Sequence, residues 1–468
     1  MAFFAAKGQT FLYPFGPEAF LDRNVDGRLA CSALMQHFME MFAMEGTLSA
    51  FLDRKDGRPL WAHSPEGTLP HMREGAMRLA VAADMEDVPA MCRELSEILL
   101  CISVLDHLCG FNFDVQASGM EAKIRRRMMP EEGSGDRFGS WKAGKVKEKG
   151  IVPSPDAISC ELPSLMRLVK VFRQYPPRPC SLANFSESLR CGHFETAILF
   201  LSAWAFQEKM DPEHALRMTN DKFFRRLSAV EDALFKRGKS LGDSSLDEMM
   251  GLWRASKGQE HPHVFKQKNG HRFNEAGFPG FLGLSKLAED LADPAKGDAW
   301  TLSQTPLSIA LHAVEEGFEA TDAYERGDMP LFDEELGDMI MQVVFMAENC
   351  LRRGFFGMRE ILEYSPAPTA DHEAFGIFSG LPEGCSAIAR SIRLQEVAVS
   401  HGFEWRDVAA VQDKVDEEIL ELEAEMAQGN TFLAQRELGD LMFAALKLAR
   451  WQGGFDENSI LSGLKEIL

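Results

Sequence analysis

The sequence predicts an all-α protein built from repeated helical hairpins. Apolar residues recur at the helical period of 3.6 residues in most segments, whereas the two-residue alternation of a half-buried strand is scarce. The acidic pattern of residues 315–338 also recurs in residues 417–440, each position 102 residues after its counterpart and without a gap. A glycine, Gly327 or Gly429, separates two helical patterns in each copy. These observations favour tandem helical bundles.

Taken in order, the chain divides into four modules in two related halves. Helical patterns in the first half cover residues 29–52, 72–85, 89–109, 162–173, 194–208 and 211–237. The last of them begins at Asp211-Pro212, an N-cap residue followed by proline in the first turn. Residues 130–158 and 257–280 read as linkers and residues 364–384 as a loop, because Gly, Pro, Lys or His dominate them. The predicted modules are residues 29–130, 155–256, 281–363 and 383–468.

Each copy of the repeat carries four acidic side chains that would meet between its two helices, because residues three apart share one helical face. The first quartet comprises Glu316, Glu319, Glu335 and Asp338, and the second comprises Glu418, Glu421, Glu437 and Asp440. Four neighbouring carboxylates repel one another unless a cation lies among them. Oxygen ligands without His or Cys favour Mg²⁺, or Mn²⁺, over zinc.

The alternative is that these acids form the solvated faces of ordinary helices. Their identical spacing in two copies argues against it, and so do their apolar neighbours, such as Val314 and Leu336. The second helix of each copy also has a glycine in its interior, Gly337 or Gly439, which costs about 1 kcal/mol relative to alanine. A site that needs a close approach to the backbone would explain that cost.

Bulk composition limits the partners. The chain has 468 residues and a formal charge of −21, which argues against nucleic acid because phosphate backbones need clustered cations. Nine cysteines without a C-x-x-C pair suit a reducing compartment, and the start of the chain lacks the basic region of a signal peptide. The longest apolar run, residues 197–206, is too short to span a bilayer. We therefore expect a cytoplasmic protein without membrane or nucleic-acid partners.

With these residues in view, the chain resembles the MazG family of all-α nucleoside triphosphate pyrophosphohydrolases, whose signature is E-E-x-x-E, a spacer, and then E-x-x-D. The resemblance covers nearly all of residues 29–468 and is most specific in the second half and at residues 205–255. It implies Mg²⁺-dependent hydrolysis of a nucleoside triphosphate to a monophosphate and pyrophosphate by a helical bundle that dimerises. In that chemistry a metal-activated water attacks the α-phosphorus, and the sequence leaves open which glutamate takes its proton.

The first half departs from the family signature. It keeps Glu74 and Glu94, but other residue types stand at four signature positions, namely Met77, Glu97, His193 and Thr196. We therefore expect the first half to have lost its metal sites. It retains Lys222 and Arg226, which lie four apart on one helical face and suit the binding of phosphates.

The second half shows the opposite pattern. It keeps the acids and Lys414, one turn before Glu418, but the chain stops at Leu468, before any equivalent of the basic segment. We therefore expect a composite active site. Catalytic Glu418 and Glu421, with Lys414 at the phosphates, would come from the second half, and substrate-binding Lys222, Arg226 and Trp253 from the first. The duplication would then act as an internal pseudo-dimer, with a homodimer as the alternative.

Two competing interpretations stay open at this point. Lys222 and Arg226 could instead form a solvated helix end, where cations are favoured anyway.

The first acid quartet has His312 in place of Lys414, so we expect it to bind metal but to contribute less to catalysis. As a whole the chain is either a hydrolase that removes non-standard or surplus nucleotides, or a catalytically weakened regulatory or binding scaffold.

Overall fold

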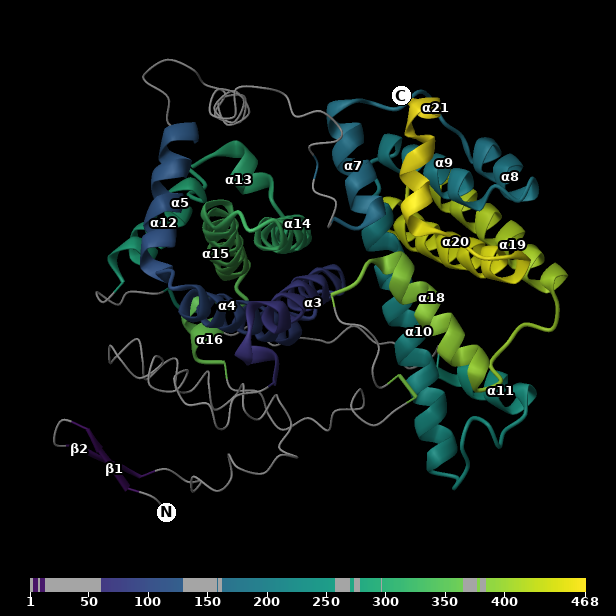
Figure 1. The fold of residues 1–468 in the computed structure, drawn as a ribbon, viewed down its shortest axis with the longest axis horizontal. Helices are drawn as coiled ribbons and strands as arrows, with labels where there is room; N and C mark the ends of the chain where they lie inside the picture. The colour runs from purple at the N-terminus through teal and green to yellow at the C-terminus, as the bar shows by residue number, and fades with distance from the viewer. Residues whose placement is uncertain are drawn as a thin grey trace. The chain divides into compact units, whose positions relative to one another are not determined.

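The computed structural model describes residues 3–6, 9–12, 60–128, 158, 162–256, 270–272, 278–295, 297–364, 377–378 and 384–468. These residues are helical apart from turns, loops and one short antiparallel hairpin, so the all-α prediction is confirmed for this part of the chain (Figure 1). The hairpin pairs β1 (Phe3–Ala6) with β2 (Gln9–Leu12) in a segment whose sequence gave no clear pattern. The predicted helix at residues 29–52 and most of the predicted linkers lie outside the described residues.

The chain forms two compact units, and each unit contains a segment from both halves of the sequence. Unit 1 consists of Met1–Ile151 and Val264–Thr369, and unit 2 consists of Val152–His263 and Ala370–Leu468. The halves are therefore interleaved, because a stretch of the first half folds together with a stretch of the second half in both units. The four predicted module boundaries stay a prediction.

Unit 1 is built around two packed helical hairpins. Its main helices are α3 (Pro65–Asp84), α4 (Val88–Cys109), α5 (Phe113–Met128), α12 (Pro279–Leu291), α14 (Pro306–Glu325) and α15 (Met329–Arg352). The short elements are η2 (Leu60–His63), α13 (Ala299–Ser303) and α16 (Met358–Leu362). α3 packs on α4, α14 packs on α15, and the hairpins meet through α3 and α14, while α5 lies against α15 and α12.

Unit 2 repeats part of this plan. Its main helices are α7 (Ser164–Gln174), α8 (Leu182–Arg190), α9 (Phe194–Gln207), α10 (Pro212–Phe235), α11 (Leu246–Ser256), α18 (Ala387–Ser400), α19 (Val408–Ala427) and α20 (Thr431–Gln452). It ends with η5 (Glu457–Gly463) and α21 (Leu464–Ile467). α19 and α20 form a hairpin, and α10 lies against α20 and α18, as α5 lies against α15 and α12.

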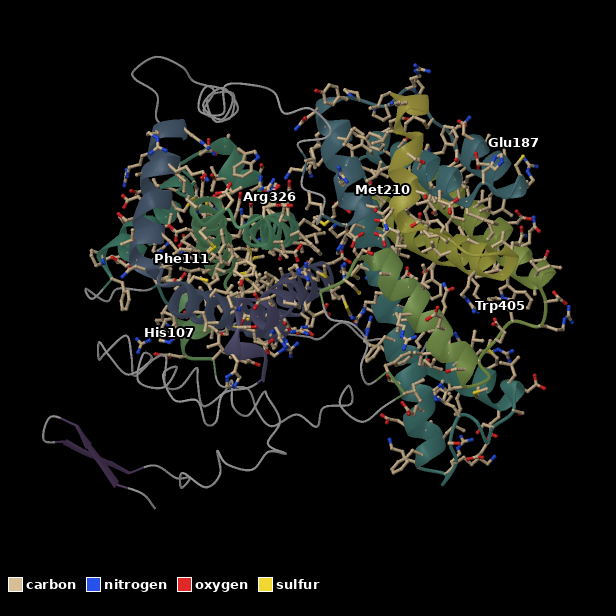
Figure 2. The ribbon with its side chains drawn as sticks, in the orientation of Figure 1. His107, Phe111, Glu187, Met210, Arg326 and Trp405 are labelled. Carbon is tan, nitrogen blue, oxygen red and sulfur yellow. The ribbon has the colours of Figure 1, made fainter. Side chains whose placement is uncertain are left out.

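Large apolar side chains fill the interior of each unit. In unit 1 Phe281 and Phe332 are fully buried, and the Phe111 ring, labelled in Figure 2, meets the Phe332 ring at a centroid distance of 5.8 Å. In unit 2 Phe172 and Phe185 are fully buried. Burying a side chain of this size contributes roughly 1.5–3 kcal/mol, and Phe332 makes this contribution on α15, which also carries Glu335 and Asp338.

Among the described residues, no single helix is both long and apolar enough to cross a bilayer. α4 and α5 are long and apolar enough only when taken together, and the two helices are bent by 109° at the break between them. Each cysteine in the described part of the chain is a free thiol.

Candidate functional site

The two acid-bearing hairpins are turned by the same local device. Gly327, between α14 and α15, and Gly429, between α19 and α20, both have a φ of 71°. Asp328 and Asn430 then cap the following helices, because each side chain accepts a hydrogen bond from the backbone N–H three positions further on. A left-handed residue after a helix costs least when it is glycine. The glycine and the N-cap residue that follows it, which recur at equivalent positions in the sequence, therefore turn the chain into two antiparallel hairpins.

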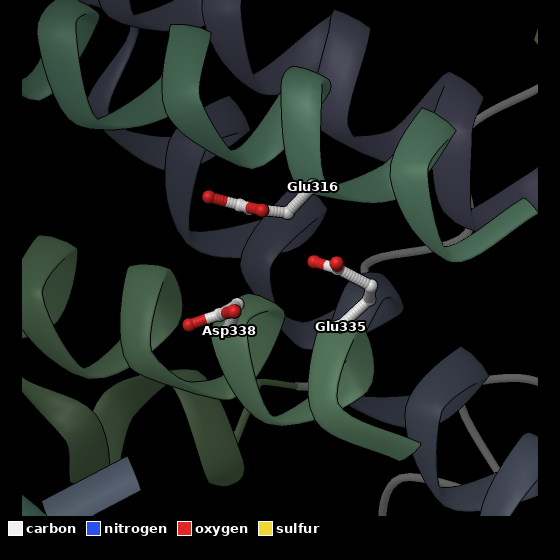
Figure 3. A group of neighbouring side chains, drawn as sticks. All are labelled: Glu316, Glu335 and Asp338. Atoms are coloured by element: carbon white, nitrogen blue, oxygen red, sulfur yellow. The ribbon is translucent and has the colours of Figure 1, made fainter. Parts of the chain in front are cut away.

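The first acid centre consists of Glu316 on α14 and of Glu335 and Asp338 on α15 (Figure 3). One carboxylate oxygen from each side chain lies within 4.8 Å of the other two. Glu335 and Asp338 are only 6% and 8% exposed, and burial raises the pKa of the Asp338 carboxyl. Glu319, the fourth predicted member, is half-buried on α14 and is not part of this group of three.

The second acid centre consists of Glu418 and Glu421 on α19 and Glu437 on α20, again with oxygens within 4.8 Å of one another. Asp440, the remaining predicted member, lies one turn after Glu437. Burial is the main cause that raises the pKa of Glu437, and the charges of Asp440 and Glu421 raise it further. The second predicted quartet is therefore gathered in one place, with three members in mutual contact range.

Glu418 is the most strongly perturbed acid of the second centre. It is 3% exposed, and burial, assisted by the charges of Asp440 and Glu421, raises its pKa to about 7. Lys414 opposes that rise, since its Nζ lies 2.7 Å from Glu418 Oε1. The other oxygen, Oε2, is buried and receives no hydrogen bond. A buried carboxylate oxygen without a donor, among further carboxylates, fits a hard divalent cation such as Mg²⁺ or Mn²⁺.

A basic side chain from the first half reaches the second acid centre. The Lys222 ammonium on α10 donates a hydrogen bond to Asp440 Oδ2, and Thr219 Oγ1 donates to Asp440 Oδ1 at 2.7 Å. Lys222 lies in the middle of α10 rather than at a solvated helix end. The two groups that the sequence analysis assigned to one composite site are therefore in direct contact.

The glycine inside α20 is what allows α10 to come so close. A Cβ added at Gly439 would lie 2.1 Å from the carbonyl oxygen of Ala215 and 2.6 Å from Thr219 Oγ1, both on α10. No real side chain could occupy that space without moving the helix. The close approach at this glycine is made by the neighbouring helix α10, whose contact with α20 also brings Lys222 to Asp440.

An aromatic cluster lies next to Lys222. Arg226, one turn further along α10, lies over the Trp253 ring at 5.8 Å from its centroid. Trp253 also packs against Phe223 and Phe403, with centroid distances of 5.4 and 5.2 Å. The structure therefore brings the predicted substrate-binding residues Arg226 and Trp253 together, one helical turn from Lys222.

Lys123 and Arg127 of α5 are further candidate residues, which the sequence analysis did not single out. Lys123 Nζ lies 2.7 Å from Asp338 Oδ2 and 2.7 Å from Glu334 Oε1, at the edge of the first acid centre. Lys123 and Arg127 lie 99 positions before Lys222 and Arg226 in the sequence, and the residues of each pair are four positions apart. This repeated basic pair was a signal in the sequence that could have revealed them.

Arginine side chains pair with acids that the first half carries near the signature positions. Arg78 on α3 pairs with Glu94 at 2.8 Å and with Glu97 at 3.0 Å, and both carboxylates lie on α4. Glu94 is 1% exposed and is also paired with Arg93, at 2.7 Å. The retained Glu94 is thus held by two arginines, and the retained Glu74 acts electrostatically on Arg78. In the other first-half module His193 is exposed just before α9.

Comparison with known protein families matches residues 304–365 to the MazG nucleotide pyrophosphohydrolase domain. This stretch contains α14, α15 and the first acid centre. The nucleoside triphosphate pyrophosphohydrolase of Escherichia coli (strain K12) is 30% identical over 203 residues, covering 36% of this chain and 77% of the relative.

Two further relatives are more distant. The nucleoside triphosphate pyrophosphohydrolase/pyrophosphatase MazG of Thermotoga maritima is 25% identical over 214 residues, covering 40% of this chain and 82% of the relative. The uncharacterised protein YabN of Bacillus subtilis is 26% identical over 226 residues, covering 41% of this chain and 46% of that protein.

Proposed function

Since this chain belongs to the MazG family of nucleotide pyrophosphohydrolases, we propose that it is a Mg²⁺-dependent enzyme that hydrolyses a nucleoside triphosphate to a monophosphate and pyrophosphate. Its role would be the removal of non-standard or surplus nucleotides in the cytoplasm. Mn²⁺ would substitute for Mg²⁺, because both cations prefer oxygen ligands.

The second acid centre is the proposed site of turnover. The contact between Lys222 and Asp440 carries this assignment, because it places a first-half cation beside second-half acids. Lys414, paired with Glu418, supplies another cation at the same centre. A protein with a net charge of −21 needs such a local group of cations to hold a triphosphate.

Each group has a role that follows from its chemistry. Glu418, Glu421, Glu437 and Asp440 would hold the metal. When bound, the metal would neutralise phosphate charge and activate the attacking water. Lys414, Lys222 and Arg226 would bind and orient the phosphates, and a carboxylate of the centre would accept the proton of the water. Trp253 would stack on the base, because every base presents a π-face to an aromatic ring.

The decisive experiment compares Lys222→Ala with Lys236→Ala. Both lysines belong to the same helical region, but Lys236 is exposed just after the end of α10. Pyrophosphate release from a panel of NTPs and dNTPs with Mg²⁺ should be abolished by Lys222→Ala and unchanged by Lys236→Ala, with both variants folded by circular dichroism. Near-normal turnover of Lys222→Ala would remove the composite site.

The same assay tests the alternative function. Absence of pyrophosphate release from every NTP and dNTP would favour a regulatory or nucleotide-binding scaffold. Arg78 pairs with Glu94 and Glu97, two carboxylates that could otherwise bind a metal cation. This pairing supports the scaffold alternative for the first half alone.

A further inference from the structure

α10 contacts two helices of the second half, α20 and α18, along different sides. On the side that faces α20, Thr219 and Lys222 both donate hydrogen bonds to Asp440. The backbone of α10 comes close there, because a Cβ at Gly439 would lie 2.1 Å from the carbonyl oxygen of Ala215. These three residues of α10 are spaced by four and three positions, so they share one helical face. A rotation or a slide of α10 would therefore separate Lys222 from Asp440.

The side of α10 that faces α18 is polar and buried. It carries Glu213, Arg217 and Asn220, which are again spaced by four and three positions and are at most 5% exposed. Glu213 Oε1 accepts a hydrogen bond from the backbone N–H of Ala387 at 2.8 Å. Arg217 Nη2 donates one to the carbonyl oxygen of Cys385, just before α18, at 3.2 Å. We call this row of buried groups the α10–α18 polar seam.

Asn220 makes the polar seam specific for one register of the two helices. Its Nδ2 donates a hydrogen bond to the carbonyl oxygen of Ala387 at 2.8 Å, and its Oδ1 accepts one from Ser391 Oγ at 2.5 Å. Asn220 and Ser391 are both fully buried. A shift of α10 would leave these groups without partners and away from water, which is costly, whereas apolar packing is not directional. The seam therefore fixes how α10 is rotated and placed on α18.

Unit 1 builds the equivalent contact, between α5 and α12, in a different way. Asp114 Oδ1 accepts a hydrogen bond from the backbone N–H of Phe281 at 2.8 Å, just as Glu213 does from Ala387. The glycine before Phe281 then lets the helices approach closely, because a Cβ at Gly280 would lie 2.1 Å from the carbonyl oxygen of Asp114. Close backbone packing thus holds α5 on α12.

The hydrogen bonds of Asn220 are not repeated at the matching positions of unit 1. Ser285 and Ser391 each lie four residues after the backbone N–H groups just compared, but Ser285 Oγ is buried and has no hydrogen-bond partner. Glu121 lies 99 positions before Asn220 and pairs with Arg125 of its own helix at 2.8 Å. The buried amide is therefore a feature of unit 2 rather than a requirement of the helix crossing.

We propose that Asn220 is a positioning residue of unit 2, which holds Lys222 against Asp440 by fixing the register of α10 on α18. Its own side chain contacts α18, whereas Lys222, two residues later, contacts α20. The consequence for turnover rests on the proposed function, in which Lys222 binds a phosphate, but the effect on the Lys222–Asp440 contact does not. Loss of the amide should weaken that contact without removing either charge.

A double-mutant cycle in urea unfolding tests this effect in the full chain without substrate. The midpoints of Lys222→Met, Asp440→Asn and their combination are measured with Asn220 in place and again in an Asn220→Ala background. With Asn220 in place, the midpoint shift of the combined variant should be smaller than the sum of the two single shifts, because the residues are in contact. In the Asn220→Ala background the single shifts should add.

The kinetic consequence is measured by pyrophosphate release. Asn220→Ala should lower kcat/KM for NTP hydrolysis about tenfold. Adding Lys222→Ala should then cause a smaller further loss than it causes in the wild type, because part of the contribution of Lys222 is already gone. If Asn220 only stabilised the fold, Lys222→Ala would cost the same factor in both backgrounds.

Asn349→Ala is the matched control. Asn349 is 8% exposed in unit 1, and its Nδ2 donates a hydrogen bond to the carbonyl oxygen of Gln304 at 2.8 Å, so its loss also removes a buried amide. The Lys222–Asp440 coupling should survive in this variant. The proposal is overturned if the coupling is absent with Asn220 in place, if it survives in a folded Asn220→Ala variant, or if Asn349→Ala removes it too. A chain that turns over no NTP would refute the proposed function, and the unfolding cycle would still decide the role of Asn220.

Discussion

The two acid centres share one construction but differ in the charges around it. Both lie between the helices of a hairpin turned by a left-handed glycine, and both are met by a first-half helix that crosses at an interior glycine. The second centre has Lys414 beside Glu418, whereas the first has His312 at the equivalent position, 3.9 Å from Glu315. The repeat therefore carries the scaffold, and a few side chains change the charges around it.

A second difference lies at the helix crossing. Thr219 donates a hydrogen bond to Asp440, but its counterpart Met120 offers no donor to Asp338. Lys123 instead shares its ammonium with Glu334, where the second unit has Arg436. Unit 2 thus has Thr219, Lys414 and Arg436 where unit 1 has Met120, His312 and Glu334, which is why we propose that turnover takes place in unit 2.

The largest expected effect comes from matched acid variants in the two centres. Glu421→Gln should lower kcat/KM for NTP hydrolysis about a thousandfold, because a charge that holds the catalytic cation is lost. Glu319→Gln should change it less than about threefold, which is about 0.6 kcal/mol. Pyrophosphate release measures both variants. Equal losses would contradict the assignment of turnover to unit 2.

The two interior glycines sharpen the comparison through stability. Gly439→Ala should destabilise unit 2 by about 3 kcal/mol, because its Cβ would lie 2.1 Å from a backbone oxygen that cannot rotate away. Gly337→Ala should be within about 1 kcal/mol of wild type. Its nearest neighbour is the flexible Met120 side chain, and alanine favours the helix. Urea denaturation followed by circular dichroism provides the measurement. Similar losses of stability in the two variants would show that the α5–α15 contact is as close as the α10–α20 contact.

Asp106 makes the stability of unit 1 depend on pH. The equivalent residue of unit 2 is Ala205, which does not ionise. Burial raises the pKa of Asp106 to about 7, and its Oδ2 has no hydrogen-bond partner. A raised carboxyl pKa favours the protonated form in the folded state, so this contribution to stability falls as pH rises from about 4 through about 7. Asp106→Asn should therefore stabilise the protein by about 2 kcal/mol at pH 8 and leave it almost unchanged at pH 4. Melting temperatures that shift equally at both pH values would exclude this ionisation.

The smallest expected effect concerns the aromatic cluster of unit 2. Trp253→Leu should raise KM for NTP about tenfold with little change in kcat, because a stacking contact contributes roughly 1–3 kcal/mol to binding. Initial-rate kinetics separate the two parameters. A loss in kcat with KM unchanged would mean that Trp253 positions Arg226, which it contacts at 5.8 Å, rather than the base.

Much of the fold could be predicted because helix signals are local. Asp211 with Pro212 marks the start of α10, and Gly327 and Gly429 mark the turns, as the structure confirms. The interleaving of the halves could not be predicted in the same way, because it depends on contacts between segments far apart in the sequence. One long-range clue did exist, since a costly glycine inside a helix, such as Gly439, indicates a close neighbour.

The candidate site was predicted in part for similar reasons. Equal spacing revealed both acid sets, but the spacing could not separate the three mutually close carboxylates from Glu319 or Asp440, because side-chain direction depends on neighbouring cations. Lys123 was missed because it lies just before a predicted linker and its acidic partners lie more than 200 residues away. The role of Arg78 was missed because a salt bridge across two helices has no sequence signature of its own.

A double-mutant cycle between Lys222 and Asp440 tests the central claim most directly, because the two residues come from different halves of the chain. Pyrophosphate release is measured for Lys222→Ala, Asp440→Asn and the double variant, with folding checked by circular dichroism. The composite site predicts strong non-additivity, so that the double variant is no slower than the slower single variant. Losses that simply multiply would show that the two halves do not build one centre.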